Sequence, residues 1–135
     1  MIGEENLITW LKAYGRAWET RDPESVAALF TEDATYQETP FTEPLRGRAA
    51  IREYWLKVVV ERQKQIQFGF KVLAIQESLA FARWWCSFFS LPAGKRISLD
   101  GIFVLDFNDH GLCRELSEWW MRKEGGNPAP DGDAT

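Results

Sequence analysis

Three side chains of this sequence are the candidates for moving a proton in a reaction: Glu38, Glu118 and Tyr14. A carboxyl group held in an apolar pocket has a raised pKa, and such a group can act as a general base near neutral pH. A phenol can donate a hydrogen bond to a carbonyl oxygen of a ligand. The sequence therefore allows acid–base chemistry on a small molecule, provided that the fold brings these side chains together.

Glu38 is the strongest candidate for the base. It is expected at the end of a short strand, among Tyr36, Phe41, Trp55 and Phe103, whose apolar rings would raise its pKa by desolvation. The alternative is a carboxylate at the rim, in solvent or capping a backbone amide. For Tyr14 the alternative is a core tyrosine whose hydroxyl is satisfied by the backbone.

Glu118 has three open interpretations. It could form a carboxylate pair with Glu38, or it could hold a cation, because a buried lone charge is costly and needs a partner. The candidate cations are Arg46, Arg48 and a ligand amine. Alternatively, a bulge could turn Glu118 outward, beside Lys123 or Arg114.

Several kinds of site are disfavoured by composition. The chain has one histidine, His110, in an expected turn, so a histidine-rich metal site or a histidine-containing triad is not expected. The net charge is −4 and the basic residues are scattered, which argues against a nucleic-acid partner. No apolar run approaches the roughly 18 residues that would span a bilayer, so we expect a cytoplasmic protein without a membrane partner.

The front of the chain has helical patterning. Residues 4–20 place apolar side chains at helical spacing, and Asp22-Pro23 is typical of the start of a second, short helix. Residues 34–38 predict a short strand, and a third helix is expected to begin near Arg48. The expected buried residues of the three helices are Leu7, Leu11, Tyr14 and Trp18; Val26, Leu29 and Phe30; and Ile51, Trp55, Val58 and Val59.

The rest of the chain predicts four long strands, at 65–77, 79–91, 96–107 and 112–123, separated by short turns. The 135 residues are enough for one domain, expected over 1–124, with a disordered tail at 125–135. We therefore expect an α+β fold in which a curved sheet wraps three N-terminal helices around one core.

Side-chain alternation divides the strands between two faces. One face is expected to hold Trp84, Cys86, Phe88, Leu99, Gly101, Phe103, Leu116, Glu118 and Trp120, and the other Arg83, Trp85, Phe89, Asp100, Ile102, Val104 and Trp119. Cys86 and Cys113 fall on opposite faces by this count, which argues against a disulfide. Both faces are apolar, so we expect a homodimer through Trp85, Ile102, Val104 and Trp119, with the C-terminal tail as the alternative cover.

The order of these elements and several phrases resemble a known superfamily. The phrases are TEDATYQETPF, GRAAI and FNDHGLCRELSEWW, and the resemblance, over residues 4–123, is to the nuclear transport factor two-like superfamily, notably its SnoaL-like members. This resemblance implies a cystatin-like α+β cone fold, in which a curved mixed or antiparallel sheet wraps three N-terminal helices and forms a cone-shaped pocket. Members include isomerases, dehydratases, hydrolases, cyclases and noncatalytic domains, so fold alone does not decide function.

Within that superfamily, ketosteroid isomerase can be laid directly against this chain. The resemblance implies that Tyr14 is the catalytic tyrosine and that Glu38 stands at or beside the base, with Phe30, Trp55 and Trp120 at pocket positions. The departure is Phe103, which stands where the family has a protonated, hydrogen-bond-donating aspartate. A second comparison, with epoxide hydrolases of the superfamily, is disfavoured because Arg83 and Asp100 are expected on the outer face.

The combined expectation is a cofactor-free site for a small hydrophobic or cyclic ligand. Glu38 and Tyr14 are the candidate catalytic residues, and the expected ligand-binding residues are Trp18, Tyr36, Phe41, Trp55, Phe68, Trp84, Phe103, Glu118 and Trp120. If catalytic, the chemistry would be proton transfer in an isomerisation, dehydration or cyclisation. The alternative is a noncatalytic ligand-binding or protein-interaction domain.

Overall fold

A computed structural model describes residues 2–125 and confirms the α+β class. The elements are α1 (Glu4–Glu19), α2 (Pro23–Ala27), β1 (Phe30–Gln37), β2 (Leu45–Arg46), α3 (Arg48–Trp55), the π-helical turn η1 (Leu56–Val60), β3 (Gln63–Gln76), β4 (Leu79–Ser90), β5 (Lys95–Phe107) and β6 (Cys113–Glu124). The expected tail lies, apart from Gly125, outside the described residues.

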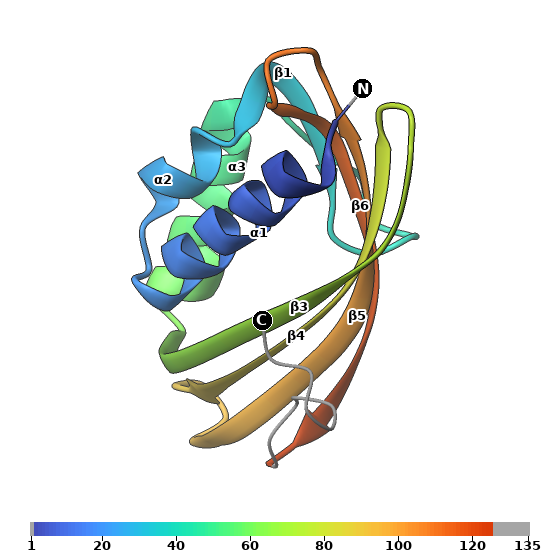
Figure 1. Cartoon of the computed structure of the whole chain (residues 1–135). Helices are drawn as coiled ribbons and strands as arrows, with labels where there is room; N and C mark the ends of the chain where they lie inside the picture. Colours follow the sequence, from blue (N-terminus) through green and yellow to red (C-terminus); the bar gives the residue numbers. More distant parts are fainter. Residues whose placement is uncertain (1, 126–135) are drawn as a thin grey trace.

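The six strands form one mixed sheet in the order β2-β1-β6-β5-β4-β3. β1 runs parallel to β6, and all other neighbours are antiparallel. Figure 1 shows that the long strands curve and that the three helices lie on one side of the sheet, with α1 across its concave face. This layout is the expected cone, in which the helices and the inner sheet face enclose one core.

The start of α2 was read correctly from the sequence, but its end was not. The Asp22 carboxylate accepts a hydrogen bond from the Ser25 backbone N–H at 3.2 Å, and Pro23 occupies the first turn, where a missing N–H costs nothing. The helix then ends at Ala27. Phe30, expected on the helix, is the first residue of β1, where pairing with Cys113 of β6 holds it.

The strand registers confirm the predicted division into faces. Trp84 pairs with Gly101 and Gly101 with Trp120, while Phe103 pairs with Glu118, all on the inner face. One local exception corrects a prediction, because the register shifts between Asp106 and Phe107 and leaves Arg114 as an extra residue. Cys113 consequently turns inward, so both cysteines belong to the buried core, and both are free thiols.

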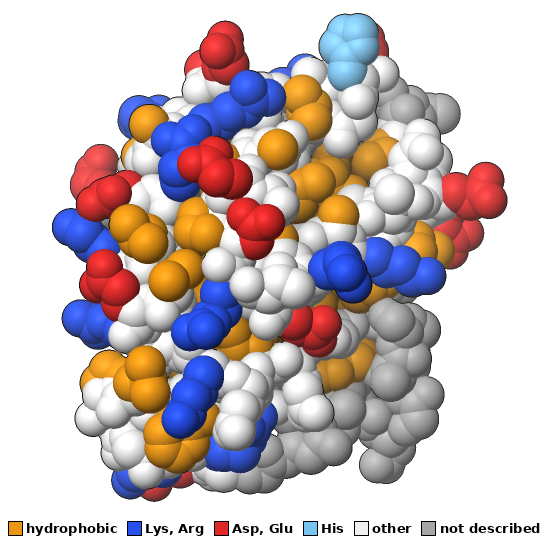
Figure 2. Space-filling model, turned by 90° about the vertical axis from the view of Figure 1, so that its left-hand side faces the viewer, with side chains coloured by type: hydrophobic (Ala, Val, Ile, Leu, Met, Phe, Trp, Pro, Cys, Tyr) orange, Lys and Arg blue, Asp and Glu red, His pale blue; other side chains and the backbone are white. Residues whose placement is uncertain are grey.

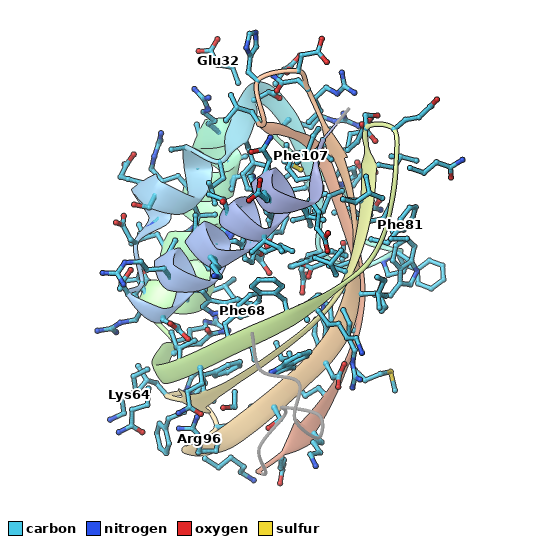
Figure 3. All side chains as sticks on the ribbon, viewed as in Figure 1. Glu32, Lys64, Phe68, Phe81, Arg96 and Phe107 are labelled. Carbon is cyan, nitrogen blue, oxygen red and sulfur yellow. The ribbon has the colours of Figure 1, made fainter. Side chains whose placement is uncertain are left out.

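The outer sheet face is partly covered by its own side chains. Trp85 is only 3% exposed, because its indole lies over Gly69, where an added Cβ would come within 2.3 Å of Trp85 Nε1. Trp85 therefore offers little surface to a second copy, unlike Trp119, which is 49% exposed. Arg83 and Asp100 form an ion pair on this face, with Arg83 Nε and Asp100 Oδ1 3.0 Å apart. Phe81 projects from the same side in Figure 3, away from α1.

The opposite, helical side has a mixed surface. Figure 2 shows acidic and basic side chains interspersed over it, without a single field of one sign. Such a surface has no stripe of basic residues for a nucleic acid to follow. Within residues 2–125, no helix is long and apolar enough to cross a membrane.

Candidate functional site

A cavity of about 520 Å³ lies between the helices and the inner face of the sheet. Its walls come from α1, β1, α3, η1 and the four long strands, so the whole cone contributes to it. The lining residues are Tyr14, Trp18, Tyr36, Glu38, Tyr54, Trp55, Val58, Val59, Arg62, Gln63, Trp84, Phe88, Ser90, Pro92, Ala93, Ile97, Leu99, Glu118, Trp120 and Arg122. Most of these side chains are apolar or aromatic, and only a few polar groups converge on the space, which is typical of a small-molecule site.

The buried polar groups of the cavity form a hydrogen-bonded chain. The hydroxyls of Tyr14 and Tyr36 are 2.8 Å apart, and the Tyr36 hydroxyl is also hydrogen bonded to the Glu118 carboxyl group. The fold explains the meeting, because Tyr36 of β1 pairs with Leu116 of β6, two residues before Glu118. Burial raises the pKa of both phenols, so they remain neutral donors.

Glu118 is the buried carboxyl group of the cavity, with 6% of its surface exposed. Desolvation raises its pKa well above the usual range, and the nearby Glu38 charge raises it further, while the hydrogen bond from Tyr36 opposes both effects. Among the described residues no basic side chain pairs with it. The site therefore favours the neutral, protonated acid, which can donate a hydrogen bond.

Glu38 occupies a different environment. It follows the last residue of β1, Gln37, and is only partly buried, so desolvation raises its pKa while a hydrogen bond with the Tyr54 hydroxyl lowers it. Burial likewise raises the pKa of Tyr54, which keeps that phenol a donor. Of the two carboxyl groups, Glu38 is thus the one that ionises more readily and the one nearer to solvent.

The backbone at Glu38 is held from the sheet. Trp120 Nε1 donates a hydrogen bond to the Glu38 carbonyl oxygen at 2.9 Å. The following loop is closed by Gln37, whose Nε2 donates to the carbonyl oxygens of Pro40 at 3.2 Å and Thr42 at 2.9 Å. An irregular segment is thereby fixed at the point where it carries a candidate catalytic group.

Three tryptophans form the aromatic wall of the cavity. The Trp18 ring packs edge-on to Trp55, with centroids 5.3 Å apart, and against Trp84 at 5.7 Å. Trp18 Nε1 donates to Gln63 Oε1 at 2.8 Å, which gives the oxygen of this buried amide a partner. The indole N–H groups of Trp55 and Trp84 are buried and have no hydrogen-bond partner among the described residues.

The structure brings eight of the eleven predicted site residues to the cavity: Tyr14, Trp18, Tyr36, Glu38, Trp55, Trp84, Glu118 and Trp120. Phe41 does not line it, because it projects fully exposed from the loop after β1. Phe103 and Phe68 lie behind the wall instead. Phe103 stacks on Trp84 at 5.3 Å, and Phe68 packs against Tyr14 and over Gly15, between α1 and β3 (Figure 3).

Several lining residues were missed by sequence reasoning. Tyr54 lies three residues after Ile51, a position on the same helical face, so the helical spacing could have found it. Arg122 continues the alternation of Glu118 and Trp120, which the strand pattern also contains. Arg62 lies in the turn before β3, where the sequence carries no periodic signal. The described residues contain no cluster of three histidine, cysteine or acidic side chains that could hold a metal ion.

Solved structures with this architecture exist at low sequence identity. One is the epoxide hydrolase/cyclase-like enzyme SalBIII, which has a role in pyran ring formation in the polyether salinomycin. The match has a TM-score of 0.76 and 22% sequence identity, and it covers 90% of this chain and 95% of that chain. Another is RV0760c from Mycobacterium tuberculosis, with a TM-score of 0.75 and 13% sequence identity. That match covers 93% of this chain and 100% of that chain. At these identities the likeness establishes the fold.

The family follows from a comparison with protein-family sequences. No curated protein matches the chain. The family described as the SnoaL-like domain matches residues 11–116, a span that runs from α1 into β6. It contains six of the eight predicted cavity residues named above, all except Glu118 and Trp120. Since that match covers most of the chain and agrees with the observed cone, the protein belongs to the SnoaL-like domain family.

Proposed function

We propose that this SnoaL-like domain binds a small hydrophobic, cyclic ligand in its cavity and transfers a proton on it without a cofactor. The observation that carries the proposal is the pair of carboxyl groups in one apolar cavity, with Glu118 deeply buried and Glu38 partly exposed. Two titratable groups whose surroundings push them toward different protonation states mark an acid and a base. Glu38 is the base in this proposal, and Glu118 is the acid.

The buried chain supplies the hydrogen-bond donor that the sequence comparison found missing. Phe103 cannot donate, but Glu118 stands directly opposite it on β6 and faces the same side of the sheet. Tyr36 donates to Glu118 when that carboxyl group is ionised, and the bond reverses when Glu118 is protonated, so that Glu118 donates to Tyr36. Tyr36 can then donate to Tyr14, which leaves the Tyr14 hydroxyl to donate to a ligand oxygen. The carboxyl donor has thus moved to the neighbouring strand.

The proposed reaction begins with a carbonyl compound that has an acidic C–H next to the carbonyl group. Glu38 takes that proton, and the electron pair of the C–H bond moves onto the carbonyl oxygen as an enolate. The Tyr14 donor stabilises the oxygen charge, which is worth most in a site that excludes water. Glu38 then returns the proton to the original carbon or to a conjugated one, so that the enzyme ends unchanged.

The first prediction tests Glu38 with a defined probe. The bicyclic ketone 2-tetralone exchanges its α-protons for deuterium in D2O, and NMR measures the rate above the buffer background. We expect the protein to accelerate this exchange and Glu38→Gln to reduce the acceleration by about 100-fold or more, because general base catalysis contributes about 10²–10⁴. Glu43→Gln is the matched control, since Glu43 is exposed in the same loop and does not line the cavity.

A noncatalytic ligand-binding domain is the second candidate. It is favoured by the mutual hydrogen bond of Tyr14 and Tyr36, which satisfies two fully buried hydroxyls without any ligand. In that case 2-tetralone would bind, as seen in a raised melting temperature, but its exchange rate would equal the buffer rate. Acceleration that survives Glu38→Gln unchanged would also exclude Glu38 as the base.

A further inference from the structure

The mouth of the cavity carries two arginines that the proposed chemistry does not use. Arg62 and Arg122 both line the cavity, at the end where the β4–β5 turn contributes Pro92 and Ala93. Among the residues that the structure describes, neither guanidinium forms an ion pair, whereas Lys95 and Arg114 pair with Glu124 and Asp106. Two cations without an ion-pair partner in residues 2–125 thus lie at the opening of an apolar cavity, in a chain whose net charge is −4.

The two arginines are placed by the sheet on both sides of the opening. Arg62 directly precedes β3, and its carbonyl oxygen accepts a hydrogen bond from the Leu91 N–H at 2.8 Å, just beyond the end of β4. Arg122 lies on β6 opposite Leu99 of β5. Since β4 and β5 lie between β3 and β6, the two cations flank the same end of the sheet. Lys64 and Arg96 are seen at this end in Figure 3.

The cavity therefore has its carboxyl groups, Glu38 and Glu118, and its guanidinium groups, Arg62 and Arg122, in different parts of its lining. Glu118 and Arg122 both face inward from β6 and are separated by four residues, or about 13 Å of extended strand. A ligand with an acidic group would meet Glu38 and Glu118 if that group entered first, and it would meet the two arginines if the group stayed outside. Electrostatics thus fixes one orientation of such a ligand.

We propose that the cavity selects an amphiphilic acid: a ring system about 13 Å or less in length enters the aromatic cavity, and its anionic group remains at the mouth between Arg62 and Arg122. The proposal rests on the cavity being the ligand site of the proposed function, but it does not depend on proton transfer. Carboxylate, sulfonate and phosphate groups share the required chemistry, since arginine binds each of them through paired N–H donors.

Two fluorescent probes of one scaffold test the proposal. They are 8-anilinonaphthalene-1-sulfonate, which is anionic, and N-phenyl-1-naphthylamine, which lacks the sulfonate. Because an ion pair that is partly shielded from water contributes more than a fully exposed one, we expect Arg62→Gln and Arg122→Gln each to weaken sulfonate binding about three- to ten-fold. Binding of the neutral probe should change less than about two-fold. Arg46→Gln is the control, because Arg46 is exposed on β2 and does not line the cavity.

The site of binding is checked by NMR. Both probes should shift the methyl signals of Ile97 and Leu99, which line the cavity, rather than those of Ile102 and Val104 on the outer face. Raising the salt concentration should weaken sulfonate binding in the natural protein and much less in the double variant, since salt screens exposed charges. If the sulfonate probe binds as tightly to both variants as to the natural protein, or if neither probe reaches the cavity, the proposal is wrong.

The outcome is separable from that of the proposed reaction. If the protein discriminates the two probes through Arg62 and Arg122 but never accelerates exchange of 2-tetralone, the proposed amphiphilic ligand stands and the proposed proton transfer is wrong. If the protein accelerates the exchange but binds both probes equally, the proposed proton transfer stands and the proposed role of the arginines is wrong.

Discussion

Glu118 shows how a single buried residue ties stability to pH. Its pKa is raised in the folded protein well above the ordinary value of 4.5, chiefly by desolvation. Above that value the unfolded chain releases the proton while the folded chain retains it, so the unfolded state binds fewer protons. Stability conferred by the protonated group is therefore complete below about pH 4.5 and is lost as the pH rises toward the folded pKa.

The second prediction uses Glu118→Gln, which replaces the acid by a neutral amide of similar shape. The natural protein should lose up to about 1.4 kcal/mol of unfolding free energy per pH unit from this group, and the variant should lack that slope. Urea unfolding at pH 5 and pH 8 measures it: the variant should gain relative to the natural protein as the pH rises. Glu115→Gln, at an exposed position of β6, should leave the slope unchanged.

At the scale of elements, the close pairing of β5 and β6 positions both ends of the site. Gly101 permits the approach, since an added Cβ would lie 2.5 Å from the Trp119 carbonyl oxygen and 2.7 Å from Trp120 Cβ. Trp120 in turn holds the Glu38 carbonyl oxygen. A glycine in the middle of a strand therefore supports a carboxylate on a loop after a different strand.

The third prediction follows from that contact. Gly101→Ala should lower the free energy of unfolding by about 1–3 kcal/mol, because the methyl group meets backbone atoms that cannot rotate away. Thermal and urea unfolding measure the loss. Gly3→Ala is the control, since a Cβ there meets nothing within 4 Å. Equal stability of the two variants would show that β6 can shift without cost.

Most of the fold was predictable because the signals were local. Alternation gave the faces of β4, β5 and β6, and Asp22-Pro23 gave the start of α2. The incorrect predictions concern features that depend on distant partners. β1 begins at Phe30 because β6 pairs with it in parallel, and no local sequence pattern indicates the extra residue at Arg114.

The same reasoning explains the site. Glu118 and Trp120 followed from strand parity, whereas Phe41 could not be placed, because its loop has no period and its path is set by hydrogen bonds from Gln37. The helical spacing could have identified Tyr54, and the strand alternation could have identified Arg122, but neither residue was predicted to line the site. Arg62 depended on how η1 leads into β3, which only the structure shows.

At the scale of the whole molecule, the homodimer through the outer sheet face remains a prediction. A groove of about 430 Å³ on this face is lined by Thr39, Pro40, Asp100, Gly101, Ile102, Trp119, Trp120 and Met121. Met121 is 78% exposed beside it, and Val104 is half-buried on the same face. An exposed apolar patch on a sheet face is the kind of surface that a second copy covers.

The fourth prediction tests that expectation. Trp119→Lys should shift the protein from dimer to monomer in light scattering at micromolar concentration, because two lysines would be buried against each other across a two-fold interface. Leu56→Lys, at an exposed site of η1, is the control and should not change the mass. A natural protein that is already monomeric at high concentration would refute the dimer.

The tryptophans of the cavity wall also provide an intrinsic fluorescence signal for ligand binding. Trp18, Trp55, Trp84 and Trp120 border the space, while Trp10, Trp85 and Trp119 lie away from it. A bound ring that touches the first group would therefore change the surroundings of those indoles, and with them the wavelength and intensity of their emission. The second group would not touch the ring. Occupancy could be followed in the unlabelled protein, from the part of the tryptophan emission that responds to the ligand.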